Sequence, residues 1–249
     1  MAWVETTSAS FAARHDEDQA AEASRLLDRL EVFRTRLAED LPAVPEEVAV
    51  VIHPRPFMLA LAHPWLPLAR VAAAPAARRY MAGWFTAREI HVLSPAALRT
   101  RASRVPGSHE ALELSPEHEY AHLALGTSNK LLPPPFSPAS FARYLRWAWL
   151  AEGAASWLSG QTPHLRPAIS RRLREGARPE FPPATKDSFL LGGTIFDLLE
   201  EGAGREACIA LALRLEPDGP NSAIERAFMR SASEVERDWR AHLDGLATA

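Results

Sequence analysis

Cysteine, lysine and long apolar runs are scarce in this chain of 249 residues. The single cysteine, Cys208, excludes a disulfide within the chain, and its apolar neighbours predict that it packs as a small apolar side chain of a helix. Only two lysines occur, against 26 arginines, and the formal net charge is −3. Because domains that bind nucleic acid carry a strongly basic surface, this balance predicts no nucleic-acid partner.

No segment has the length and apolar character of a membrane span. The most apolar window, residues 58–74, is interrupted by a histidine, two prolines and Arg70. Residues 1–6 lack the basic start and apolar stretch of a secretory signal. Together with the single cysteine, these absences predict a cytoplasmic protein with no membrane partner.

The remaining composition, 47% hydrophobic and 24% charged, is typical of a globular protein with a full core. Apolar periodicity predicts a mixture of strands and helices in the first half and helices alone in the second. In the first half we expect strands at 11–14 and 48–52, helices at 17–40 and 56–62, and a hairpin of strands at 81–85 and 89–93. In the second half we expect helices at 139–159, with a break before Trp147, and at 168–174, 187–201, 204–214, 221–229 and 233–246.

Four prolines between residues 129 and 138 mark a boundary between the two halves. We therefore predict a single domain over 1–249 of the α+β class. A small mixed sheet with helices forms one lobe, residues 1–128, and a mainly helical lobe follows at 129–249.

The most informative segment is His118-Glu119-Tyr120-Ala121-His122. Residues four apart lie on one face of a helix, so the two imidazoles can bind one zinc ion while Glu119 addresses the water at its open position. Zinc in a catalytic site normally has three protein ligands, and Glu152 is the candidate for the third, since two histidines with one carboxylate form a known set. The alternative is that His118 and His122 are packed histidines, each of which then needs its own hydrogen-bond partner.

The residues that flank the motif predict the helix that carries it, independently of any metal. Ser115 is typical of an N-cap, and Pro116 is typical of a first helical turn, where no N–H is needed. Gly126 is typical of the left-handed residue that ends a helix. We therefore expect a helix at about 116–125.

A second segment, residues 149–158, completes a resemblance to a known family. The pattern Trp-Leu-x-Glu-Gly-x-Ala-x-aromatic-Leu is matched by Trp149, Leu150, Glu152, Gly153, Ala155, Trp157 and Leu158. With its His-Glu-x-x-His motif, the chain resembles the gluzincin zinc metallopeptidases, and more closely the bacterial peptidase-MA-like family. The resemblance covers most of the chain, with specific motifs only at 118–122 and 149–158. It implies a zincin-like fold with the metal in the cleft between two lobes, Zn²⁺ as cofactor, and Glu152 as third ligand.

Two departures from that family concern the groups around the ligands. Family members often carry a carboxylate four residues after the third ligand, where it orients a ligand histidine; Ser156 stands there instead, and its hydroxyl is our candidate for this role. A tyrosine common in the family near Phe189 and Leu190 is missing, which leaves the transition-state stabiliser unassigned. Tyr144 and His164 lie nearest in sequence, and the alternative for each is a packed or surface side chain.

Zincins also bind substrate as an added strand along a sheet edge. By resemblance, Ile90, His91, Val92 and Leu93 form the candidate substrate-binding edge, and the alternative is a strand that pairs on both sides within the sheet. The histidines without a partner at ligand spacing are interpreted as structural: His15, His53, His63, His91, His109 and His242.

Three functions are compatible with these residues. The first is a zinc metallopeptidase that hydrolyses a peptide or protein substrate, with Glu119 as general base. The second is a non-catalytic zincin-fold module that binds zinc or a protein partner, and Glu119 disfavours it because a binding fold needs no base beside two ligands. The third is a metal hydrolase acting on another amide, although the deformylase type uses a cysteine ligand in a motif that Cys208 does not resemble. The sequence indicates no particular oligomeric state.

Overall fold

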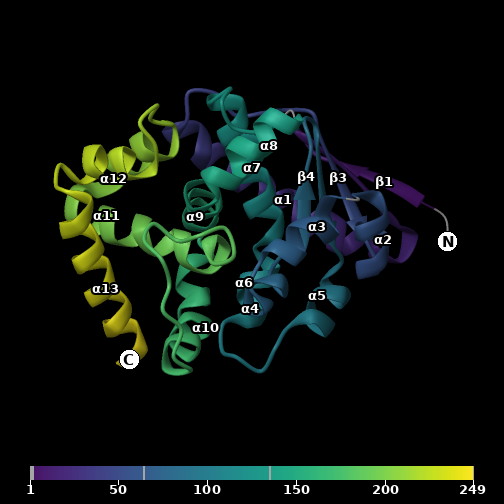
Figure 1. The fold of residues 1–249 in the computed structure, drawn as a ribbon. Coiled ribbons are helices and arrows are strands. Elements are labelled where there is room, and N and C mark those ends of the chain that lie inside the picture. Colours follow the sequence, from purple (N-terminus) through teal and green to yellow (C-terminus); the bar gives the residue numbers. More distant parts are fainter. Residues whose placement is uncertain (1–2, 64, 135, 249) are drawn as a thin grey trace.

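The computed structural model describes residues 3–63, 65–134 and 136–248 (Figure 1). Over these residues the protein is of the α+β class, as predicted, with one five-stranded sheet and a large majority of helices among its elements. None of the described helices combines the length and the apolar character needed to cross a membrane.

The sheet has the strand order β1-β2-β3-β5-β4. Its strands are β1 (Trp3–Thr7), β2 (Phe11–Asp16), β3 (Val48–His53), β4 (Gly83–Phe85) and β5 (Glu89–Leu93). The three central strands, β2, β3 and β5, run parallel, whereas β1 and β4 pair antiparallel at the two edges. Strand β1 was not predicted, because its residues alternate between half-buried and exposed and it has no fully buried apolar face.

The first half also contains helices, some of which pack on this sheet. They are α1 (Ala20–Asp40), α2 (Pro56–Ala62), α3 (Trp65–Ala72), α4 (Pro75–Arg78), α5 (Pro95–Arg101), α6 (Ser108–Glu113) and α7 (Ser115–Ser128), with a short 3-10 turn at Glu17–Gln19. The long helix α1 buries a stripe of apolar residues at helical spacing, as its sequence predicts: Ala23, Leu27, Leu30, Phe33 and Leu37.

The described residues after 137 form helices only. They are α8 (Pro138–Arg146), α9 (Ala148–Leu158), α10 (Thr162–Arg174), α11 (Ser188–Ala212), α12 (Pro220–Phe228) and α13 (Ala232–Thr248). The predicted break before Trp147 separates α8 from α9, and the two helices expected around 201–204 join in α11 across Gly204, whose φ is +81°. Helix α10 begins earlier than predicted because Pro163 fits its first turn and Pro167 is tolerated inside it.

The central helices α7 and α9 lie between the strands and the helices of the C-terminal part (Figure 1). Helix α7 packs on β4 and β5 on one side and on α9 on the other, and α9 packs closely on α11. A Cβ atom at Gly153 of α9 would lie 2.5 Å from the backbone carbon of Gly192 in α11. The glycine next to Glu152 therefore permits the close helix crossing that holds this carboxylate in place.

Candidate metal centre

Helix α7 carries His118, Glu119 and His122, and it is buried on all sides from Ser115 to Gly126. The histidines are four residues apart, so both imidazoles leave the helix on the side that faces α9. Pro116 lies in the first turn, as predicted. The helical backbone alone therefore places the two imidazoles side by side.

The helix begins within one residue of its predicted start, but both predicted capping residues are wrong. The N-cap is Leu114, and the hydroxyl of Ser115 donates instead to the carbonyl of Leu112 at 2.6 Å. Gly126 lies inside the helix, which continues to Ser128. A Cβ atom at Gly126 would overlap the carbonyl oxygen of Pro133, so this glycine serves close packing rather than helix termination.

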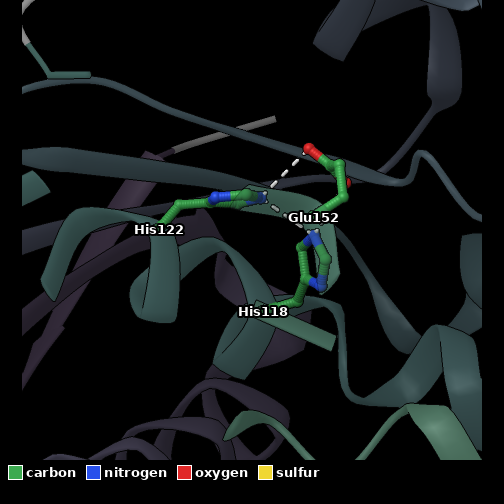
Figure 2. A group of neighbouring side chains, drawn as sticks. All are labelled: His118, His122 and Glu152. Atoms are coloured by element: carbon green, nitrogen blue, oxygen red, sulfur yellow. Dashed lines mark hydrogen bonds and ion pairs between the residues drawn. The ribbon is translucent and has the colours of Figure 1, made fainter. Parts of the chain in front are cut away.

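His118, His122 and Glu152 converge from α7 and α9 on a common point (Figure 2). The two Nε2 atoms lie 3.1 Å apart. One carboxylate oxygen of Glu152 lies 3.4 Å from Nε2 of His118, and the other lies 3.3 Å from Nε2 of His122. All three side chains are nearly closed to solvent. The three residues predicted as ligands are therefore brought together.

The spacing of these atoms is compatible with a single zinc ion. Zinc binds imidazole nitrogens and carboxylate oxygens at about 2.0–2.2 Å, which places neighbouring ligand atoms about 3.3 Å apart at tetrahedral angles. The two Nε2 atoms lie 3.1 Å apart, and each lies 3.3 or 3.4 Å from a different oxygen of Glu152. One ligand atom from each residue lies within 4.8 Å of the other two. Two nitrogens and one oxygen are a donor set that zinc accepts, and three protein ligands leave the fourth position for water.

The protonation states of the group also suit a metal. Burial lowers the pKa of His118 below its usual value, which favours the neutral imidazole. Burial alone would raise the pKa of Glu152, but the charge of His122 and the hydrogen bonds from both imidazoles hold it below its usual range. A neutral imidazole at His118 and an ionised carboxylate at Glu152 are the forms of these two groups that bind metal.

Glu119 lies beside the three ligands, and only 7% of its surface is exposed. Burial, followed by the nearby charge of Glu152, raises the pKa of Glu119 well above its usual value, as expected for a general base that works near neutral pH. The edge strand β4 lies against it: a Cβ atom at Gly83 would approach Cγ and Oε1 of Glu119 to 2.5 Å. Gly83 therefore leaves the space that the Glu119 side chain occupies.

Aromatic rings close the site around the imidazoles. The ring of Phe85 on β4 stacks on His122 with centroids 4.7 Å apart. The ring of Phe189 lies 5.2 Å from that of His118. Phe189 occupies the neighbourhood in which the resembling family often has a tyrosine, so an apolar ring and no hydroxyl meets His118 from α11.

Tyr144 lies on α8, the helix that precedes the break at Trp147, and its side chain reaches the ligand group. Its hydroxyl donates a hydrogen bond to Oε1 of Glu152. Burial, then the charge of Glu152, raises the pKa of Tyr144 well above its usual value, so the phenol stays protonated. His164, the other sequence candidate, lies on α10, where its backbone packs against Gly107.

The predicted substrate-binding edge at Ile90–Leu93 is wrong. Strand β5 pairs with β3 on one side, where Ile90 is opposite Val50, and with β4 on the other, where Ile90 is opposite Phe85. The free edge on this side of the sheet belongs to β4. The order of strands in a sheet is decided by long-range pairing, which the local sequence of this strand does not report.

The hydroxyl of Ser156 does not orient a ligand in this structure. Ser156 is fully buried on α9, and its Oγ atom makes no hydrogen bond to any described residue. Its backbone carbonyl, by contrast, accepts a hydrogen bond from the N–H of Gln161 at 2.8 Å.

Three of the histidines that the sequence indicates as structural form a cluster of their own. Nε2 of His53 lies 3.0 Å from Nδ1 of His91, and the rings of His63 and His91 meet edge to face at 3.9 Å. Burial, followed by the charge of His63, lowers the pKa of His53 to about 4 and that of His91 to about 3, so both are neutral at neutral pH. Among the described residues, His118, His122 and Glu152 are the group whose ligand atoms converge on one point.

Comparison of the chain with protein-family models, with curated proteins and with solved structures gave no match.

Proposed function

We propose that this protein is a zinc-dependent metallopeptidase, in which His118, His122 and Glu152 hold the metal and Glu119 is the general base. The observation that carries the proposal is the convergence of three buried ligand side chains, whose ligand atoms lie within 4.8 Å of one another, with the buried carboxylate of Glu119 on the residue after His118. The resemblance of residues 118–122 and 149–158 to the gluzincins supports a zincin-like assignment of the fold.

A zinc ion at this position supplies a Lewis acid and lowers the pKa of bound water to about 7. Glu119 accepts the proton of the attacking water and returns it to the leaving amine. The raised pKa of Glu119 suits both steps, because a more basic carboxylate accepts a proton more readily than an ordinary one.

The antiparallel edge strand β4 is the surface on which we propose that substrate pairs. Its backbone lies against Glu119 at Gly83 and against His122 at Phe85. An added peptide strand would therefore pass close to the base and a ligand.

An apolar cavity of about 270 Å³ adjoins this edge and is lined by Phe136, Ser137, Pro138 and Phe141. The ring of Phe136 lies 5.4 Å from that of Trp84 and 5.1 Å from that of Phe85, both on β4. We expect this cavity to accept a large apolar side chain of a peptide substrate.

A pool of peptides of defined sequence, followed by mass spectrometry, tests the proposed activity. The protein loaded with an equimolar amount of zinc should cleave peptides next to large apolar residues. Removal of the metal with a chelator should abolish cleavage, and zinc should restore it. Cleavage that persists in protein shown by metal analysis to be free of zinc would contradict the proposal. A zinc-loaded protein that cleaves no peptide would favour the non-catalytic module.

Tyr144 is the side chain that we propose as transition-state stabiliser. Its single hydroxyl proton is donated to Glu152 within the ligand group, and we propose that the hydroxyl turns from this carboxylate to donate to the oxyanion that forms during hydrolysis. Tyr144→Phe should lower kcat by about 10²–10³-fold, as loss of an oxyanion donor typically does. The measurement is kcat at saturating zinc and substrate.

Tyr120→Phe is the matched control, because its hydroxyl donates to the carbonyl of Pro45 instead, at 2.6 Å. This variant should keep kcat. If Tyr144→Phe binds zinc more weakly but has the wild-type kcat once saturated with zinc, then Tyr144 only orients Glu152 and stabilises no oxyanion.

A further inference from the structure

A cavity between α4 and α10 is lined by three arginines (Figure 1). It has a volume of about 410 Å³, and its polar lining consists of Arg79, Tyr80, Ser103, Arg171, Arg172 and Glu175. Arg79 directly follows α4, whereas Arg171 and Arg172 lie in the last turn of α10. Glu175 is the only carboxylate among the described residues of this lining, so the cavity carries a net positive charge.

Two of the three arginines have carboxylate partners. Arg172 forms an ion pair with Asp187, which is 1% exposed and thereby fixes this arginine in the wall of the cavity. Arg171 forms an ion pair with Glu175 at 2.8 Å, and both side chains are mostly exposed. An exposed pair of this kind contributes little to stability, so Arg171 can exchange Glu175 for another carboxylate at small cost.

The third arginine, Arg79, belongs to a group of arginines whose charge no carboxylate neutralises. Arg79 donates to the carbonyl of Arg101 at 2.7 Å, and Arg101 donates to the carbonyls of Arg78 and Arg79. Arg70 donates to the carbonyl of Met81 at 2.6 Å. Within the described residues, these four arginines bind backbone carbonyls and form no ion pair with a carboxylate. Burial, followed by the charges of Arg70 and Arg79, lowers the pKa of Arg101 to about 10.

The cavity adjoins the segment that leads into the edge strand β4. Met81 lies two residues before Gly83, where β4 begins. The ring of Tyr80 stacks on that of Phe189 with centroids 6.0 Å apart, and the ring of Phe189 lies 5.2 Å from that of His118. An extended peptide rises about 3.3 Å per residue, so a chain paired with β4 near the metal reaches the cavity about three to five residues from the cleaved bond.

We propose that this cavity, the arginine subsite, binds a carboxylate of the peptide substrate, which an acidic side chain or the C-terminus supplies. Arginine pairs with a carboxylate through two parallel hydrogen bonds, and Arg79 and Arg171 are both exposed to an arriving chain. The inference rests on the proposed peptidase activity and adds a charge preference to it. The apolar cavity at Phe136 and the arginine subsite would then select two features of one substrate.

The dissociation constants of matched peptides test the subsite without turnover. The zinc-loaded Glu119→Gln variant is used, so that the peptides stay intact. The two peptides of each pair have an amidated C-terminus and one large apolar residue, and they differ only in glutamate or glutamine three, four or five residues from it, on either side. We expect the glutamate peptide of at least one pair to bind about 10–100-fold more tightly, as a hydrogen bond to a charged group does.

A second set of peptides distinguishes the two sources of the carboxylate. These peptides contain glutamine throughout and end in a free or an amidated C-terminus at the same distances from the apolar residue. A preference for internal glutamate assigns the subsite to an acidic side chain, and a preference for the free C-terminus assigns it to the chain end. Either preference supports the subsite.

Charge reversal places the preference in the cavity. With Arg79→Glu, the glutamine peptide should bind more tightly than its glutamate partner. Arg171→Glu, at an exposed position on α10, gives the same test if Arg79→Glu does not fold. Arg178→Glu is the matched control, because it makes the same change in net charge at an exposed arginine outside this cavity. It should keep the wild-type preference.

Equal affinities within every pair of both sets would overturn the inference. A preference that Arg79→Glu and Arg178→Glu change equally would also overturn it, since the peptides would then respond to net charge alone. Cleavage by the wild type with no difference between matched peptides would overturn the subsite and leave the peptidase in place. Tighter binding of the peptides with a carboxylate, without any cleavage by the wild type, would support the subsite and contradict the peptidase.

Discussion

Replacing Glu119 with glutamine is expected to leave zinc bound and to lower kcat/KM for peptide hydrolysis by about 10²–10⁴-fold, the usual contribution of a general base. The amide is nearly the same size as the carboxylate, so it fits the space beside Gly83. It cannot accept the proton of the attacking water. The two measurements are zinc content by mass spectrometry of the purified protein and kcat/KM on the best peptide of the pool.

Glu110→Gln is the control for the chemical change alone, because Glu110 is exposed on α6. It should retain both zinc and activity. A Glu119→Gln variant that cleaves peptides like the wild type would exclude Glu119 as the base. If the wild type binds zinc but is indistinguishable from Glu119→Gln in every peptide assay, the result would favour the non-catalytic zinc- or protein-binding module.

Removal of the third ligand is expected to have the second large effect. Glu152→Ala should weaken zinc binding by well over about 100-fold, the upper end for groups that only orient a ligand. Glu152 provides the only carboxylate of the converging group and accepts from Tyr144, so its loss leaves two imidazoles that cannot hold the ion alone. Competition with a chelator of known affinity measures the change.

Glu201→Ala removes an exposed carboxylate from α11 and should leave zinc affinity unchanged. His118→Ala and His122→Ala should resemble Glu152→Ala rather than this control. Undiminished zinc in all three ligand variants would show that the metal is bound elsewhere on the chain.

The geometry of the ligand group could be predicted from the sequence because local structure fixes most of it. His118 and His122 share one helical turn, so their common direction follows from the helix alone. Glu152 required more, because the approach of α9 to α7 is a tertiary contact. One residue in the sequence relates to the packing of α9. Gly153, next to Glu152, lacks a side chain and thereby permits α9 to cross α11 closely.

The substrate edge could not be predicted by the same means. The residues of β4 and β5 predicted a hairpin, and the two strands do pair antiparallel. Which of the two strands pairs with β3 depends on residues about forty positions upstream, and no local pattern at Ile90–Leu93 reports it.

The contact of Tyr144 with Glu152 could not be predicted from the sequence, which offered Tyr144 and His164 alike. Tyr144 is eight residues before Glu152, and only the break at Trp147 folds α8 back so that the hydroxyl meets the carboxylate.

Anomalous diffraction at the zinc absorption edge, from crystals of the zinc-loaded protein, tests the metal centre most directly. We expect one strong peak per chain, bounded by Nε2 of His118, Nε2 of His122 and the carboxylate of Glu152, about 2.0–2.2 Å from each ligand atom. A zinc-loaded crystal with no peak at this position, or with its zinc bound only by other residues, would contradict the assignment.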